Sequence, residues 1–172
     1  ALIIGYDDGI IDLVYRDRVV AIKSINEAET QSSKTINDFE RSGKNVFAAT
    51  DLGIALIDLN VSEVRDIYQE IGPDGAKIIV WDIKILNDSL YAFTSMGLQA
   101  VNLKDNLFDF NNWRHYEETA DLPIRQLFVQ NQKIVALGFD QVYSQQAGIW
   151  DTLFSLPVAF NYVVESTANI YG

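Results

Sequence analysis

The chain has 172 residues, and 48% of them are hydrophobic, so it is long and apolar enough to form one folded domain with its own core. Its net charge of −11 argues against binding to nucleic acid or to an anionic membrane, and is interpreted as keeping a β-rich surface soluble. The absence of cysteine excludes disulfides, thiol catalysis and cysteine-based metal sites.

Neither end of the sequence shows a targeting or membrane segment. No apolar run approaches the ~20 residues that cross a bilayer, so no membrane insertion is predicted. No signal peptide is visible at the start, where Ala1 leads directly into a strand-like run. Residues 169–172 end inside another such run, so we expect the chain to be a fragment or a processed product.

Short β-hairpins recur along the chain at an interval of 44 residues. Residues 45–59 are predicted to form two short strands joined by a tight turn that contains Thr50 and Gly53, and the second strand alternates apolar with small or polar residues. Residues 88–103 show the same hairpin pattern, with Thr94 and Gly97 in the turn. Upstream, residues 2–13 place Gly9 44 positions before Gly53. A third copy of the longer repeat begins at residue 124, but its turn has drifted to Gly138 and Gln141. Periods of this length indicate a repeat architecture.

Each repeat is interpreted as four strands, a to d. Strand a is predicted at residues 36–40, 80–85 and 124–129, and strands b and c form the hairpins. Strand d is predicted at residues 18–23, 64–70, 113–117 and 148–153. Residues 61–72 also show helical spacing with Gly72 as a stop, so a helix is the alternative there. Four short strands per repeat predict an all-β fold, namely a β-propeller fragment of about four blades of four antiparallel strands.

The predicted blade units of this single propeller domain are residues 1–34, 35–78, 79–122 and 123–158, with a partial unit at 159–172. The first unit begins at strand b, and residues 160–164 align with strand a. That segment either completes the first blade and closes a small ring, or the chain is an open arc of a larger propeller. In the second case other domains or chains pair with its edges, because exposed edge strands need cover.

The candidate ligand-binding residues are those predicted on one face of the propeller. Asp7, Asp8, Asp51 and Asp140 fall at equivalent b–c corners, where carboxylates either bind Ca²⁺ or sugar hydroxyls or simply stabilise turns. Trp113, on a predicted strand d, is either an exposed platform for a sugar or partner or a packed side chain. The sequence has no dedicated calcium loop, and neither a metal nor a cofactor is expected.

Features of an enzyme are weak. His115 is the only histidine and lies on a predicted outer strand, so a Ser-His-Asp triad is disfavoured and a histidine-based metal site is excluded. Trp81-Asp82 opens a strand a rather than closing a strand c, so it is not interpreted as a WD repeat. No phosphate-binding loop, G-x-S-x-G or H-E-x-x-H motif is present. A propeller enzyme with paired carboxylates in its channel is the remaining enzymatic hypothesis.

Several of these motifs resemble those of a known family. Residues 36–59, with KNVFAATDLGI, and residues 80–103, with DSLYAFTSMGL, resemble two-component-regulator propeller repeats. The opening IIGYDDGIIDL, and LFDFNNW followed by Leu122-Pro123, are similar to PorZ-type proteins of the Bacteroidetes type IX secretion system. Gln141 departs from the pattern of the hairpin turns.

The resemblance implies a non-enzymatic binding or scaffold propeller of an exported protein at the cell surface or in the periplasm, related to type IX secretion. The alternative that it implies is a periplasmic propeller of a hybrid two-component histidine kinase, with an oligosaccharide as its ligand.

Overall fold

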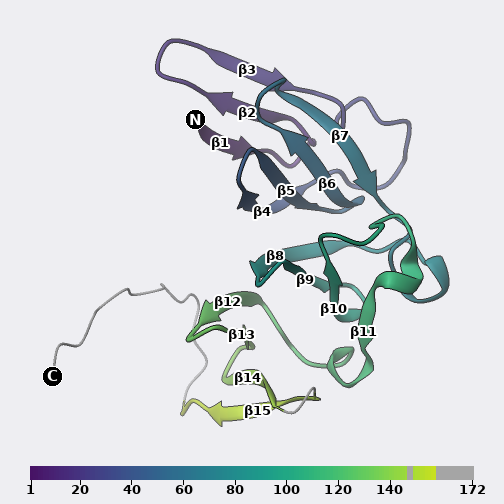
Figure 1. Cartoon of the computed structure of the whole chain (residues 1–172), viewed down its shortest axis with the longest axis vertical. Coiled ribbons are helices and arrows are strands. Elements are labelled where there is room, and N and C mark those ends of the chain that lie inside the picture. The colour runs from purple at the N-terminus through teal and green to yellow at the C-terminus, as the bar shows by residue number, and fades with distance from the viewer. Residues whose placement is uncertain (147–148, 158–172) are drawn as a thin grey trace, which may run out of the picture.

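A computed structural model describes residues 1–146 and 149–157, which form antiparallel sheets stacked one after another along the chain (Figure 1). The first sheet has three strands: β1 (Leu2–Gly5), β2 (Ile11–Val14) and β3 (Val19–Ile22). The second has four: β4 (Ile36–Ser42), β5 (Asn45–Thr50), β6 (Gly53–Asp58) and β7 (Glu63–Tyr68). The third comprises β8 (Val80–Leu86), β9 (Ser89–Thr94), β10 (Gly97–Asn102) and β11 (Arg114–Tyr116). The fourth comprises β12 (Gln126–Gln130), β13 (Lys133–Leu137), β14 (Gln141–Gln146) and β15 (Ile149–Ser155).

The predicted all-β architecture is confirmed. The complete sheets follow the expected a-b-c-d order, and the first sheet lacks strand a. The helical alternative for residues 61–72 is wrong, because that stretch contains strand β7. The connections between the described sheets contain three single-turn 3₁₀ helices: η1 (Pro73–Gly75), η2 (Phe110–Asn112) and η3 (Glu117–Thr119). Residues 160–164, predicted to supply another strand a, lie outside the described residues.

The repeated threonine and glycine build the turn between strands b and c. The hydroxyl of Thr50 donates to the carbonyl of Gly53 at 2.9 Å and accepts the amide of Leu52 at 3.0 Å. Thr94 makes the equivalent bonds one repeat later. Gly53 has φ +103°, and a Cβ there would lie 2.1 Å from the carbonyl oxygen of Tyr68. These residues therefore recur because the turn requires them.

Consecutive sheets pack face to face, so the central strands are buried on both sides. In β5, Val46 and Ala48 face the first sheet, while Phe47 and Ala49 face the third. The same alternation places Leu98 of β10 in the core between the third and fourth sheets. Period-two packing on both faces explains why these strands are almost continuously apolar.

The ends of the strands define two sides of the assembly. Because neighbouring strands run antiparallel, the β1–β2, β5–β6, β9–β10 and β13–β14 turns lie on the same side as the β3–β4, β7–β8 and β11–β12 connections. We call this side the turn face. The inner strands β4, β8 and β12 lie side by side (Figure 1). Within the described residues, no helix has the length and hydrophobicity needed to cross a membrane.

Candidate functional site

The four predicted aspartates all lie in turns of the turn face, but the structure gives them different surroundings. Asp7 and Asp8 are in the β1–β2 turn, and a carboxylate oxygen of Asp8 accepts the amide of Ile10 at 3.1 Å. Asp51 accepts a hydrogen bond from the side-chain amide of Asn37 at 3.0 Å. Asp140 is exposed in the β13–β14 turn. Asp8 thus shows the local turn bonding weighed as the alternative to ligand binding.

Asp51 is the one of these aspartates that lines a described pocket, about 300 Å³ in volume, between the second and third sheets. The pocket walls come from the β5–β6 and β9–β10 turns and from the β3–β4 and β7–β8 connections. Hydroxyl, amide, carboxylate, ammonium and aliphatic groups all contribute to the lining: Thr30, Ser32, Asp51, Leu52, Gln69, Lys77, Ile78, Ile79 and Ser95. Such a mixed lining suits a ligand with both polar and apolar parts.

Trp113 is not an exposed platform. Its side chain is buried, 3% exposed, in the core between the second and third sheets, and its indole nitrogen donates to the carbonyl of Leu107 at 3.0 Å. Trp150 is equally buried, in the next core. The exposed tryptophan is instead Trp81, 41% exposed at the start of β8. Trp113, just before β11, and Trp150, on β15, both fill the space between sheets, because large aromatic rings gain most from burial.

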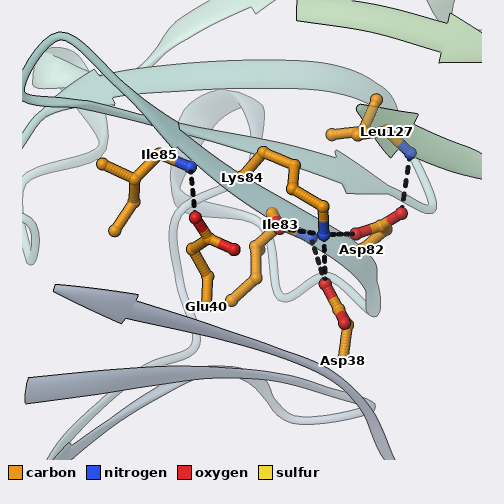
Figure 2. A network of polar contacts seen from close by, with 7 residues as sticks. All are labelled: Asp38, Glu40, Asp82, Ile83, Lys84, Ile85 and Leu127. Carbon is orange, nitrogen blue, oxygen red and sulfur yellow. Dashed lines mark hydrogen bonds and ion pairs between the residues drawn. The ribbon is translucent and has the colours of Figure 1, made fainter. Parts of the chain in front are cut away.

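A polar network joins the inner strands (Figure 2). The ammonium of Lys84 lies 2.8 Å from a carboxylate oxygen of Asp38 on β4 and 2.8 Å from one of Asp82 on its own strand. Asp82 also accepts the backbone amide of Leu127 on β12 at 2.7 Å. Lys84 thus joins acids from two neighbouring sheets, and Asp82 in turn contacts the sheet after its own.

The carboxylates bond the same backbone position of the next inner strand in successive sheets. Asp82 accepts the amide of Leu127, 45 residues later, and Asp38 receives that of Ile83, also 45 residues later, at 3.4 Å. Glu40 accepts the amide of Ile85 at 3.3 Å. Sequence comparison aligns Asp38 with Asp82 but does not reveal this contact, because the acceptor and donor lie on different sheets.

Burial divides the charge of this network unequally. Asp82 is the more buried acid, and burial together with hydrogen bonding and repulsion from Asp38 raises its pKa to about 7. Burial also acts to raise the pKa of Asp38, but the hydrogen bond with Asp82 and the charge of Lys84 outweigh it and lower that pKa. Burial disfavours the ammonium of Lys84, yet the two carboxylates leave its pKa raised. Asp38 therefore carries the negative charge paired with Lys84, and Asp82 is the acid that takes up a proton.

The surroundings of His115 can be described within residues 1–146 and 149–157. It lies on β11 opposite Gln99 of β10, and its Nδ1 atom has no hydrogen-bond partner among the described residues. The buried side-chain oxygen of Gln99 is also unpaired there. Burial lowers the pKa of His115. Among the described residues, no group of three or more histidine, aspartate or glutamate side chains is placed to hold a metal ion.

Charge is distributed unevenly between the two ends of the sheets. The turn-face connections contain eleven acidic and four basic residues, whereas the connections at the opposite strand ends, within the described residues, contain four of each. The acidic residues of the turn face are Asp7, Asp8, Glu27, Glu29, Asp51, Glu70, Asp74, Glu117, Glu118, Asp121 and Asp140. Its basic residues are Lys23, Lys34, Lys77 and Arg125. Most of the chain's net charge of −11 thus belongs to the side that carries the pocket.

Antiparallel sheets of three or four strands, stacked around a common inner side, define a β-propeller domain. The chain belongs to the family of the N-terminal β-propeller domain of PorZ from the type IX secretion system, whose family model matches residues 1–114. No match was found among curated proteins.

Solved structures share the fold. PorZ from Porphyromonas gingivalis, described as an essential bacterial surface component of the type IX secretion system, has a TM-score of 0.71 and 22% identity over 91% of this chain and 21% of its own. The extracellular domain of BT4673, a hybrid two-component system of B. thetaiotaomicron, has a TM-score of 0.54 and a sequence identity of 11%; the match covers 97% of this chain and 22% of that one. The CNH domain of AfRom2 has a TM-score of 0.62 and a sequence identity of 10%; the match covers 96% of this chain and 53% of that one. The chain therefore spans about a fifth of the PorZ and BT4673 chains, and at these identities the likeness concerns the fold alone.

Proposed function

We propose that this chain is a non-enzymatic binding and scaffold propeller of an exported cell-surface protein that takes part in type IX secretion. Its membership of the PorZ N-terminal propeller family, over residues 1–114, supports the proposal most directly. The blade units at residues 1–34, 35–78, 79–122 and 123–158, with a partial unit at 159–172, then form part of a ring completed by other domains or chains.

Gene deletion in the bacterium that encodes the protein tests this role. We expect proteins that use the type IX route to be lost from the cell surface, and to return when the gene is restored. Antibody labelling of intact cells should detect the propeller itself at the surface. Unchanged cargo display in the deletion strain would contradict the secretion role, and labelling only after cell lysis would contradict the surface location.

A periplasmic propeller that senses an oligosaccharide is the second candidate. It is supported by the hydroxyl, amide and carboxylate groups of the pocket around Asp51, on a fold shared with the extracellular domain of a two-component system. A thermal-shift screen of the chain against neutral and acidic oligosaccharides tests it. A raised melting temperature that is lost in Gln69→Ala would support sensing, while no shift with any sugar would count against it.

A further inference from the structure

An exposed apolar edge borders the pocket on the turn face. Ile79 lines the pocket and is 36% exposed. Trp81, two residues further along, is 41% exposed, and Met96, next to the pocket residue Ser95, is 45% exposed. The indole of Trp81 is supported on one side by Phe93, with ring centres 4.8 Å apart. Tryptophan and methionine that are held in place yet open to solvent are enriched at protein interfaces.

A repeated β-bulge explains why Trp81 points outward. The pairing of β4 with β5 shifts register between Ile36 and Asp38, and the pairing of β8 with β9 shifts between Val80 and Asp82. The bulged residues are Asn37 and Trp81, which occupy equivalent positions 44 residues apart and are both exposed while Val80 and Asp82 are buried. A bulge re-aims one side chain out of the regular alternation.

The first bulged residue brings a carboxylate next to the second. The side-chain amide of Asn37 donates both to Asp51, at 3.0 Å, and to the carbonyl of Val80, at 2.8 Å. The carboxylate of Asp51 is thereby held beside the backbone that leads into Trp81. Its other oxygen, Oδ2, receives no hydrogen bond from the described residues.

The geometry points to a cationic segment of a partner protein as the occupant of this surface. A lysine or arginine side chain from the partner pairs with Oδ2 of Asp51 and rests on the open face of Trp81, a combination of ion pairing and cation–π contact. The excess of acidic residues in the turn-face connections attracts such a segment and repels an anionic one. This inference rests on the proposed scaffold function, since it names the surface and the partner chemistry.

Fluorescence anisotropy with a labelled short peptide of alternating arginine and glycine tests the inference at physiological ionic strength. We expect the full chain to bind this peptide and not its glutamate-glycine counterpart. Trp81→Ala and Asp51→Asn should each weaken binding by about fivefold or more. Asparagine at position 51 still accepts the bond from Asn37, so that variant removes the charge and keeps the turn.

Asp105→Asn is the matched control, because it removes one exposed charge from a connection at the opposite strand ends. If Asp105→Asn and Asp51→Asn weaken peptide binding equally, the peptide is held by the overall negative charge and not at this surface, and the inference is overturned. Binding of a neutral oligosaccharide that Trp81→Ala abolishes, without peptide binding, would assign the surface to a sugar instead. Thermal melting of each variant checks that it is folded. The gene-deletion experiment on cargo display does not depend on peptide binding, so a negative result here would overturn this inference without deciding the proposed role in secretion.

Discussion

Replacing Asp82 with asparagine should change how the stability of the chain depends on pH. The buried carboxyl has a pKa of about 7 in the folded protein, against 3.8 when unperturbed. Between these two values the folded state holds a proton that the unfolded state has released. The wild-type protein therefore loses free energy of unfolding as the pH rises through this range. Asparagine has no proton to lose, so the variant should not show this part of the slope.

The size of the effect follows from the pKa difference. A rise from 3.8 to about 7 corresponds to about 4 kcal/mol at ~1.4 kcal/mol per unit. Because Asp38 and Asp82 titrate together, the change caused by Asp82 alone is smaller than this value. We expect the wild-type free energy of unfolding to fall by at least about 1 kcal/mol across this pH range. The lowered pKa of Asp38 acts in the opposite direction, but its contribution is lost only as the pH falls below 3.8, outside the range concerned.

Urea unfolding of wild type and Asp82→Asn near pH ~4.5 and pH ~8 measures the difference. The asparagine can accept only one of the two bonds that Asp82 accepts, so a pH-independent loss of about 1 kcal/mol accompanies the substitution. Relative to wild type, the variant should gain stability towards pH ~8. The reasoning would be refuted if the difference in free energy of unfolding between Asp82→Asn and wild type did not change with pH, or if the variant became less stable relative to wild type as the pH rises. Asp105→Asn, at an exposed acid, should show no such trend.

Three further substitutions test the network and the turn by urea unfolding. Lys84→Met leaves two acids near each other without their shared cation and should cost about 3 kcal/mol; a cost below about 1 kcal/mol would contradict the role of the ion pairs. Thr50→Val keeps the methyl group but loses two buried hydrogen bonds, and should cost about 2 kcal/mol. Thr50→Ser keeps the hydroxyl and should retain most of that stability; a loss in Thr50→Ser as large as in Thr50→Val would contradict the role of the hydroxyl. Gly53→Ala forces a Cβ against the carbonyl oxygen of Tyr68 and should cost more than about 3 kcal/mol. Gly43 also has a positive φ, +61°, but open space around it, so Gly43→Ala should cost about 1 kcal/mol. Similar costs for the two variants would show that the backbone moves to remove the clash with Tyr68.

The fold can be predicted well from the sequence because turn residues and alternating apolar residues, which are short-range signals, define the repeat. Thr50 and Gly53 mark one turn, their copies 44 residues later mark another, and apolar alternation marks the strands between them. The lack of strand a in the first sheet also follows from the alignment. Turn residues and period-two patterns depend mainly on the chain close by, so one sequence reports them.

The candidate site is harder to predict because it depends on contacts between sheets. Trp113 was a candidate for the surface and is buried, whereas Trp81 is exposed because it is the bulged residue of β8, and no pattern in the sequence predicts that bulge. Asp38 and Asp82 align at equivalent positions, yet nothing local indicates that they share Lys84. The placing of Asp51 beside Trp81 depends on one amide that reaches from the second sheet to the third.

The carboxylate contacts between inner strands give the stack a direction. In each contact the acceptor lies N-terminal to its donor: Asp38 precedes Ile83, and Asp82 precedes Leu127. Every one of these acceptors belongs to the earlier sheet, so each carboxylate fixes the position of the inner strand that follows it in the chain. At the position equivalent to Asp82 in the fourth sheet the chain has Gln126, a neutral amide, so the series of carboxylates ends there.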